Sequence, residues 1–262
     1  METPDIEFHP NVATNIDQLS TSMSVPGMGT MVTNAFVLRA TEPMLVDAGI
    51  TAYGDAMIER LSSVLDLESL RWIYITHADN DHVGPLHELL MRAPLARVVT
   101  TYMGMAKLSQ VQPIAPQRVF LLNPGQTLEL GDRQVTAVAP PVYDAPETTM
   151  LWDPVSRALF SSDCFGGLVL EPVERASSVP ADALRDGMLT WLMAESPWVR
   201  SVDPAAMDQA LRRVSELRPQ TVLSAHLAPA PDMLDVLLDT LRLGRGAPPF
   251  VGPDQAAFAS AP

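Results

Sequence analysis

The sequence predicts a mixed α/β fold, a four-layer αββα sandwich in which two β-sheets pack face to face and helices cover both outer faces. Two observations indicate this architecture. Strand-like segments precede helix-like segments twice along the chain. The chain has 262 residues, of which 47% are apolar, which is enough for one substantial core. We therefore expect one domain over residues 1–243 and a flexible tail, rich in Gly, Pro and Ala, over residues 244–262.

The first half of the chain alternates between strand and helix patterns. Residues 31–38 and 44–47 are expected to form paired strands, with Glu42-Pro43 in the turn between them. Apolar residues at helical spacing predict a helix over residues 54–65. The elements expected next are a strand over residues 71–76, a helix over residues 86–90, a strand over residues 97–101 and a short helix over residues 104–111.

The second half begins with strands and ends mainly with helices. Residues 127–130 and 134–139 are expected to form a hairpin. Asp153-Pro154 is expected to turn the chain between two further strands, over residues 150–152 and 158–160. The elements expected last are helices over residues 181–193 and 205–217, a strand over residues 221–224 and a helix over residues 231–243.

The composition excludes several classes of partner. The net charge of −14 argues against nucleic acid and anionic membranes, since both bind basic surfaces. The only cysteine, Cys164, allows no intrachain disulfide and no thiolate metal cluster, and it is expected to be a small buried apolar group. The N-terminus lacks a signal-peptide pattern, and no uncharged apolar stretch reaches about 18 residues. We therefore expect a cytoplasmic protein without a membrane span.

Six residues, His77-Ala-Asp-Asn-Asp-His82, carry the strongest functional signal. Four of the six can bind a metal ion, and they follow an apolar segment that is expected to be a strand. Because side chains alternate along an extended segment, His77, Asp79 and Asp81 are expected to converge on one side. His82 can then reach a second position as the chain turns. Two histidines and two aspartates so close together indicate a metal site rather than a capped strand-to-helix loop.

Three further donors follow predicted strands. Asp144 comes just after the strand over residues 134–139, Asp163 follows the strand over residues 158–160, and His226 follows the strand over residues 221–224. Taken singly, Asp144 and Asp163 are also typical of turns, and His226 of a loop. Together with the first cluster they give seven donors, each at or just after the carboxyl end of a predicted strand. That joint pattern predicts one composite metal site.

The order and spacing of these donors resemble the metallo-β-lactamase superfamily. Within it, the chain is most similar to the oxygen-binding diiron proteins and to the metal domain of flavo-diiron proteins. Their pattern is His-x-Glu-x-Asp-His, a later His, an Asp before Phe-Gly and a final His. The matching positions here are His77, Asp79, Asp81, His82, Asp163 in Asp-Cys-Phe-Gly, and His226. The resemblance extends over nearly all of residues 30–243.

Two positions depart from the pattern. Asp79 stands where the family has Glu, so its carboxylate is one methylene shorter. The later His is replaced by a carboxylate, either Asp144 or, with a longer reach, Glu147. The resemblance implies that one metal binds His77, Asp79, Asp144 and a bridging Asp163. It implies that the second metal binds Asp81, His82, the same Asp163 and His226.

The donor set favours redox chemistry. Four carboxylates roughly cancel the charge of two divalent ions, which weakens the acidification of bound water on which metallohydrolases depend. Oxygen ligands favour iron or manganese over zinc. The leading hypothesis is therefore a non-haem diiron protein that binds or reduces O2 or a related small oxidant, or oxidises a small substrate. A zinc hydrolase of an ester, lactone or thioester is the first alternative, and a metal-binding sensor without turnover is the second.

The resemblance also bears on cofactors and partners. Flavo-diiron proteins carry a flavodoxin-like domain after the metal domain. This sequence ends about where that domain would start and has no phosphate-binding loop, so we expect no bound flavin. Electrons are expected from a separate donor protein or from the substrate, and related diiron proteins often form homodimers. Tyr143 adjoins Asp144 and is the candidate catalytic side chain, with packing at the rim of the site as the alternative.

Overall fold

The computed structural model describes residues 5–25, 28–111 and 113–256. In these ranges the strands form two sheets, and the first has the order of the sequence itself. Its three N-terminal strands are antiparallel, and the later ones are parallel to β4. The strands are β1 (Glu7–Ala13), β2 (Ile16–Val25), β3 (Gly29–Leu38), β4 (Met44–Val46), β5 (Trp72–Tyr74), β6 (Arg97–Thr100) and β7 (Val119–Leu121).

The second sheet brings three strand ends to one edge. Its order is β13-β12-β11-β10-β9-β8. Because β9 and β11 are both antiparallel to β10, and β12 is parallel to β11, the strands β9, β11 and β12 share one direction. The strands are β8 (Thr127–Glu129), β9 (Gln134–Val138), β10 (Met150–Asp153), β11 (Ala158–Phe160), β12 (Thr221–Leu223) and β13 (Ala230–Pro231).

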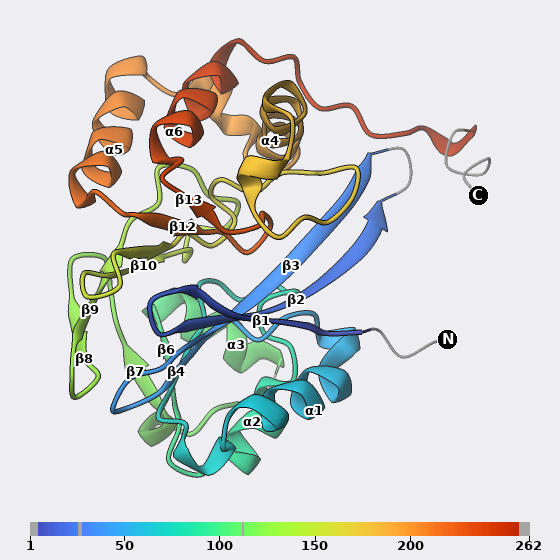
Figure 1. The fold of residues 1–262 in the computed structure, drawn as a ribbon. Helices are drawn as coiled ribbons and strands as arrows, with labels where there is room; N and C mark the ends of the chain where they lie inside the picture. The colour runs from blue at the N-terminus through green and yellow to red at the C-terminus, as the bar shows by residue number, and fades with distance from the viewer. Residues whose placement is uncertain (1–4, 26–27, 112, 257–262) are drawn as a thin grey trace.

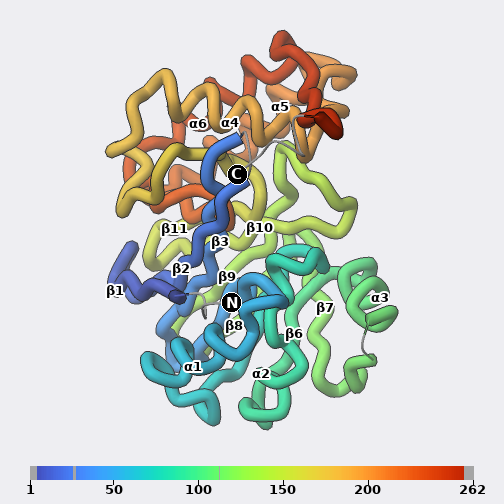
Figure 2. Tube along the Cα trace, turned by 90° about the vertical axis from the view of Figure 1, so that its right-hand side faces the viewer, coloured from blue at the N-terminus to red at the C-terminus, as the bar shows by residue number. Residues whose placement is uncertain are grey.

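Helices cover the outer face of each sheet. Helices α1, α2 and α3 lie on the first sheet, and α4, α5 and α6 lie on the second (Figures 1 and 2). Their bounds are α1 (Gly54–Val64), α2 (Leu86–Arg92), α3 (Tyr102–Val111), α4 (Ala181–Glu195), α5 (Pro204–Leu217) and α6 (Leu234–Leu243). The order helix, sheet, sheet, helix confirms the predicted αββα sandwich.

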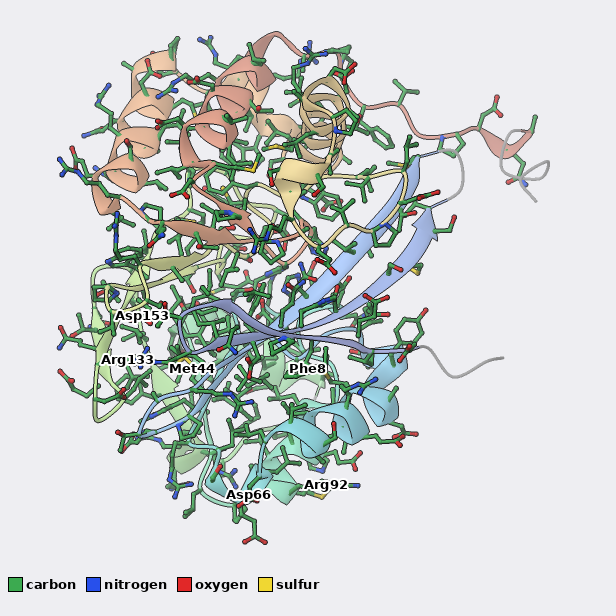
Figure 3. The ribbon with its side chains drawn as sticks, viewed as in Figure 1. Phe8, Met44, Asp66, Arg92, Arg133 and Asp153 are labelled. Atoms are coloured by element: carbon green, nitrogen blue, oxygen red, sulfur yellow. The ribbon has the colours of Figure 1, made fainter. Side chains whose placement is uncertain are left out.

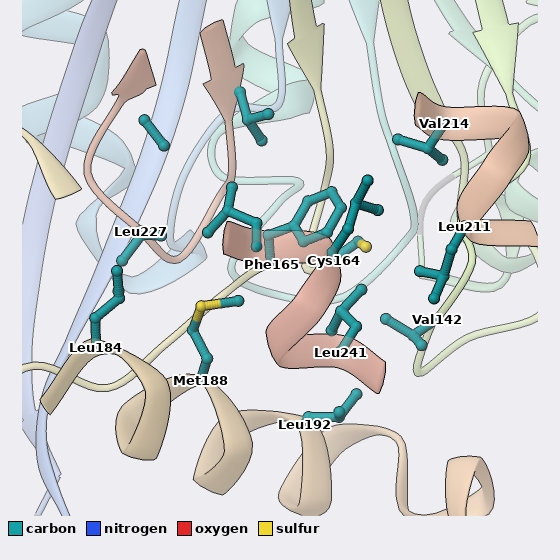
Figure 4. Packing of buried hydrophobic residues seen from close by; sticks show 14 of the residues in the cluster. Val142, Cys164, Phe165, Leu184, Met188, Leu192, Leu211, Val214, Leu227 and Leu241 are labelled. Atoms are coloured by element: carbon teal, nitrogen blue, oxygen red, sulfur yellow. The ribbon is translucent and has the colours of Figure 1, made fainter. Parts of the chain in front are cut away.

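Buried apolar side chains fill each of the spaces between these layers. The cluster between the sheets includes Phe36 of β3 and Phe160 of β11, whose ring centroids lie 5.5 Å apart. The cluster between the second sheet and its helices contains Cys164, packed with side chains of α4, α5 and α6 (Figure 4). Cys164 is 2% exposed, which confirms that it is a small buried apolar group.

The long β2–β3 hairpin crosses from the first sheet towards the layer that contains α4 (Figure 1). Backbone hydrogen bonds join Thr30 of β3 to Val169, which lies between β11 and α4. The Asn34 side chain of β3 donates to the carbonyls of Ser224 and Leu227, both 2.9 Å away. This hairpin therefore fixes the loop that follows β12.

A buried ion pair lies at the end of the second sheet opposite to the carboxyl ends of β9, β11 and β12. Arg133 Nη1 lies 3.1 Å from Asp153 Oδ2, and both side chains are almost fully buried (Figure 3). Ser156 Oγ donates to Asp153 Oδ2 at 2.6 Å. Asp153 ends β10, which runs opposite to β9 and β11, so this pair lies away from the edge where those strands end.

Most predicted elements lie where they were expected, with three differences. Strands β1, β2, β7 and β13 were not predicted. The last helix begins at Leu234 rather than at residue 231, because Ala230–Pro231 pairs with β12 and Asp232 then takes a positive φ of 56°. The segment over residues 75–82 is a loop rather than a strand end, because β5 stops at Tyr74.

The tail begins on the second helical layer. Residues Gly244–Gly246 form a 3-10 helix, and Ala247 is buried in the cluster of Figure 4. Residues 257–262 lie outside the described residues, and the flexibility of the tail stays a prediction. None of the helices in the described ranges is both long and apolar enough to cross a lipid bilayer.

Candidate metal centre

The predicted donors meet at one edge of the sandwich, in four loops. The loops follow β5, β9, β11 and β12 and carry, in turn, the 77–82 cluster, Asp144, Asp163 and His226. The donors form three overlapping groups. Within each group, the ligand atoms lie within 4.8 Å of one another. The groups are His77, His82 and Asp163; Asp81, His82 and His226; and His77, Asp79 and Asp144. All seven predicted donors are therefore brought together.

The side chains of the 77–82 loop point to two different parts of the site, which differs from the prediction. The backbone N–H groups of His82 and Val83 both donate to the Asp79 carbonyl, at 3.0 and 3.2 Å, so the chain turns back on itself. His77 and Asp79 consequently lie near Asp144, whereas Asp81 and His82 lie near His226. The expectation that His77, Asp79 and Asp81 converge by strand alternation was wrong, because this segment is not extended.

A glycine lets this loop pack against the end of β4. Gly84 has a φ of +40°, and a Cβ atom there would lie 1.9 Å from the carbonyl oxygen of Ala48. The Ala48 N–H donates to the His82 carbonyl at 2.7 Å, and the Thr51 N–H donates to the Asn80 carbonyl at 2.8 Å. The loop that carries four donors is thereby held against residues 48–51, and a larger residue at position 84 would displace it.

Asp163 lies at the centre of the cluster. Its Oδ1 is 3.0 Å from His82 Nε2 and 3.3 Å from His226 Nε2, and its Oδ2 is 3.7 Å from His77 Nε2. Asp81 Oδ2 lies 3.4 Å from His226 Nε2, on one side. Asp144 Oδ2 lies 3.6 Å from His77 Nε2, on the other. A single carboxylate between two groups of donors is the geometry of a bridging ligand.

Each of the three imidazoles is oriented through its Nδ1 atom. His82 Nδ1 lies 3.0 Å from Asp47 Oδ2, and His226 Nδ1 lies 2.8 Å from the Val32 carbonyl. His77 Nδ1 lies 3.2 Å from Ser162 Oγ. With Nδ1 engaged in this way, each ring directs Nε2 into the cluster, as metal-bound histidines do.

Two buried atoms at the centre have no hydrogen-bond partner among the described residues. They are His77 Nε2 and Asp163 Oδ1. Buried polar atoms are almost always paired, and leaving one unpaired costs about 1–3 kcal/mol. A metal ion coordinated by these atoms would remove that cost, so the residues present fit a metal centre.

The buried carboxylates of the site favour the binding of protons or cations. Burial opposes protonation of His82, but the Asp163 and Asp47 carboxylates outweigh it and raise the pKa of His82 well above its usual value. Burial also opposes ionisation of Asp163, but the three imidazoles outweigh it and hold the pKa of Asp163 well below its usual value. Protons and metal ions therefore compete for the same buried anionic centre.

Asp144 and Glu147, the two candidate carboxylates of this loop, have different surroundings. Asp144 belongs to the cluster, and Thr148 Oγ1 donates to its Oδ1 at 3.3 Å. Glu147 Oε1 instead lies 2.6 Å from Lys107 Nζ of α3. Asp144 therefore lies among the other candidate donors, whereas Glu147 is paired with Lys107.

Tyr143 packs at the rim of the site. Its ring lies 4.9 Å from the Trp198 ring, and its backbone carbonyl accepts a hydrogen bond of 2.8 Å from Trp198 Nε1. The side chain is 39% exposed. These contacts agree with the alternative that Tyr143 packs at the rim of the site. A catalytic role for its hydroxyl stays a prediction.

Sequence reasoning missed two side chains that position the donors. Asp47 accepts hydrogen bonds of 2.9 Å from both the N–H and the Oγ1 of Thr76, besides its contact with His82. Because Asp47 ends the predicted strand over residues 44–47, the strand-end criterion that selected the other donors could have found it. Trp191 of α4 stacks on His226 with centroids 4.5 Å apart and donates to the Asp163 carbonyl at 3.2 Å. No local sequence signal indicates such long-range contacts.

Glu195, one turn beyond Trp191, lines a small cavity together with Tyr143 and Asp163. Partial burial and the nearby carboxylates, chiefly Asp163 and Asp144, raise the pKa of Glu195 to about 7. The side chain adds another acidic group to the side of the site that faces α4.

Comparison with known proteins decides the family. The model of the ODP family beta lactamases matches residues 31–226. The chain belongs to this family. Because that match covers the loops that carry the candidate donors, it confirms the resemblance to oxygen-binding diiron proteins that the sequence indicated.

Curated relatives of this ODP family member are longer flavoproteins. It is 30% identical over 136 residues to the type A flavoprotein fprA of Rhodobacter capsulatus, covering 51% of this chain and 31% of the relative. It is 26% identical over 134 residues to the anaerobic nitric oxide reductase flavorubredoxin of Pectobacterium atrosepticum, covering 51% and 26%. The matched region is thus less than a third of each relative's length.

Solved structures show the same fold. A flavoprotein from Thermotoga maritima aligns with a TM-score of 0.79 at 18% identity, covering 95% of this chain and 63% of that one. The rubredoxin oxygen:oxidoreductase from Desulfovibrio gigas aligns with a TM-score of 0.72 at 18% identity, covering 87% and 59%. These likenesses confirm the αββα architecture of the ODP-family chain.

Proposed function

We propose that this chain holds two iron ions and reduces O2 or a related small oxidant such as nitric oxide. The observation that carries the proposal is the arrangement around Asp163. Three imidazoles, each oriented through Nδ1, direct Nε2 at one buried carboxylate, and two atoms of this centre lack hydrogen-bond partners among the described residues.

The geometry supports three donors for each ion, with one imidazole at the first ion and two at the second. One ion would be held by His77, Asp79 and Asp144, and the other by Asp81, His82 and His226, which correspond to two of the groups above. Asp163 would bridge them, because its two oxygens face different imidazoles.

Iron rather than zinc is supported by the carboxylates. Four of the seven donors are aspartates, and hard oxygen ligands stabilise the higher charge of oxidised iron. Bound iron would supply reversible one-electron chemistry. The names of the relatives, a nitric oxide reductase and an oxygen:oxidoreductase, agree with this choice.

The protein's own residues would orient and shield the centre. Asp47 fixes the ring of His82, and the Val32 carbonyl fixes that of His226. Trp191 covers His226 with its ring and so excludes water from that side. Tyr143 remains the candidate for orienting a bound oxidant through its hydroxyl.

Electrons would come from a separate donor protein or from the substrate. The proposal assigns no flavin to the described residues, although the curated relatives are named flavoproteins. A homodimer and a cytoplasmic location stay predictions.

The test is metal analysis of protein purified without added metal, followed by anaerobic reduction and exposure to O2 or nitric oxide. About two irons per chain, with oxidant consumed by the reduced protein, would support the proposal. Turnover of an ester, lactone or thioester with zinc alone and under strict anaerobiosis would replace it with the hydrolase alternative. Substoichiometric metal without any turnover would replace it with the sensor alternative.

A further inference from the structure

Beside the His77 group lies a buried ion pair between Glu147 and Lys107. The Glu147 side chain is fully buried, and its Oε1 is 2.6 Å from Lys107 Nζ. Lys107 reaches in from α3 and remains 38% exposed. Glu147 follows the donor Asp144 by three residues, in the same loop, so the pair adjoins one end of the metal cluster.

Lys107 is the main partner of this buried carboxylate. Apart from the Lys107 ammonium group, neither oxygen of the Glu147 carboxylate has a hydrogen-bond partner among the described residues. A buried carboxylate is costly unless a cation compensates it, so Glu147 depends on the ammonium group. In turn, the carboxylate neutralises a positive charge that α3 places next to the cluster.

The Lys107 charge acts on one end of the cluster. Lys107 interacts electrostatically with Asp79 and Asp144, two donors of the His77 group. His82 and His226, at the other end, instead lie within 3.4 Å of carboxylate oxygens of Asp47, Asp163 and Asp81.

We propose that Glu147 is a positioning residue that offsets the charge of Lys107 and thereby sets the metal affinity of the His77 position. An uncompensated ammonium group beside Asp79 and Asp144 would repel a divalent ion bound there. The ion pairs that the described residues form with His82 and His226 are all with carboxylates, so the position formed by Asp81, His82 and His226 fills first. This inference rests on the proposed function, since it requires two metal positions.

The test is isothermal titration of the metal-free protein with Fe²⁺ under nitrogen. The wild type is expected to bind two equivalents with different affinities. Glu147→Gln is expected to weaken the weaker equivalent roughly tenfold, because Lys107 loses its counter-charge, and to leave the tighter one unchanged. Lys107→Met added to Glu147→Gln is expected to restore the weaker equivalent to within about twofold of wild type, since both charges are then gone.

That restoration separates electrostatics from packing. If Glu147 acted only as a packed side chain, removing Lys107 as well would weaken binding further, and this result would overturn the inference. Unchanged affinity in Glu147→Gln would also overturn it. Lys107→Met alone is expected to bind the weaker equivalent at least as tightly as wild type, so weaker binding there is a third contrary outcome and does not depend on the folding of Glu147→Gln.

The matched control is Asp153→Asn. It removes a carboxylate from a buried ion pair of the opposite edge, where Arg133 is the partner. This variant is expected to lower the melting temperature and to leave both Fe²⁺ affinities unchanged. A wild type that binds no Fe²⁺ would overturn the proposed function and the inference together. If the wild type binds two equivalents of Fe²⁺ but the Glu147 and Lys107 variants do not change the weaker affinity as expected, only the inference is overturned.

Discussion

The metal centre and the Arg133–Asp153 pair both bury charged side chains, but they satisfy them in opposite ways. Asp153 receives the Arg133 guanidinium, a hydrogen bond from Ser156 Oγ and another from the Val155 N–H. At the centre, His77 Nε2 and Asp163 Oδ1 have no hydrogen-bond partner among the described residues. A buried network completed by the chain itself stabilises the fold, whereas unpaired atoms among clustered metal-binding side chains indicate the place of a metal ion.

The largest expected difference between the two regions comes from removing the central carboxylate of each. Asp163→Ala is expected to reduce metal content from about two per chain to nearly none, since Asp163 faces all three imidazoles. Asp153→Asn is expected to keep both metals but to lower the free energy of unfolding by roughly 2 kcal/mol, because the buried Arg133 loses one carboxylate partner and keeps only Asp132. Metal analysis and urea denaturation measure the two effects.

Retention of two metals in Asp163→Ala would show that this carboxylate does not bridge. Loss of metal in Asp153→Asn would show that the two regions are not independent.

The second prediction concerns the residue that orients His82. Asp47→Ala is expected to weaken metal binding about 10- to 100-fold, the usual effect of removing a carboxylate that fixes a metal-bound imidazole. Asp17→Ala is the control, because Asp17 is also buried in the first sheet but pairs with Arg39, away from the donors. Equal metal affinity in the two variants would contradict the role of Asp47.

How far the site could be predicted follows from the range of the interactions. The seven donors were found because each lies at or just after the end of a strand, and strand patterns are local. The sequence did not show which donors of the 77–82 loop lie together. Their positions depend on the turn that closes on Asp79 and on contacts of Gly84 with the end of β4. Trp191 was missed for the same reason, since it meets His226 only after the second sheet and α4 have packed.

The fold was predicted less completely at its N-terminus. Strand β1 contains Pro10, and its register with β2 shifts between His9 and Ala13, so neither strand shows a clean alternation of apolar and polar residues. Strand β7, with three residues, is too short to give a pattern. Such strands form because they pair with neighbouring strands of the sheet, and their own sequence pattern does not indicate them.

A third prediction uses pH to compare the empty and the metal-loaded centre. The raised pKa values of His82 and His226 contribute stability below the ordinary value of 6.5, which is lost as pH rises through the raised values. The lowered pKa of Asp163 contributes stability above its ordinary value of 3.8, which is lost as pH falls through the lowered value. Metal-free protein is therefore expected to be most stable between pH values of about 4 and 6.5.

Metal-loaded protein is expected to behave in the opposite way over this range, since its ligands bind metal only when deprotonated. Melting temperatures measured from pH 5 to 9 should fall for the metal-free form and rise or stay level for the loaded form. Parallel curves would mean that these three residues do not bind the metal.

A smaller effect is expected where the Asp163 loop meets α4. A Cβ atom on Gly166 would lie 2.6 Å from Trp191 Nε1, so Gly166→Ala must displace the indole that stacks on His226. We expect a loss of about 1–3 kcal/mol of stability and weaker metal binding. Gly125→Ala is the comparison, because a Cβ there meets no atom within 4 Å, although its φ of +87° adds local strain. Metal affinity that falls equally in both variants would contradict a specific role for the Trp191 contact.

The smallest expected effect belongs to Tyr143. Tyr143→Phe keeps the ring that packs against Trp198 and removes only the hydroxyl. Metal content and melting temperature are expected to stay unchanged, and kcat for oxidant reduction is expected to fall less than about tenfold, the loss of one oriented hydrogen bond. Tyr143→Leu, which also removes the stacking on Trp198, should lower stability as well. If Tyr143→Phe reduces oxidant as fast as wild type, the residue is only a packed side chain at the rim. The catalytic contribution of this part of the site would then have to come from a neighbouring acid such as Glu195.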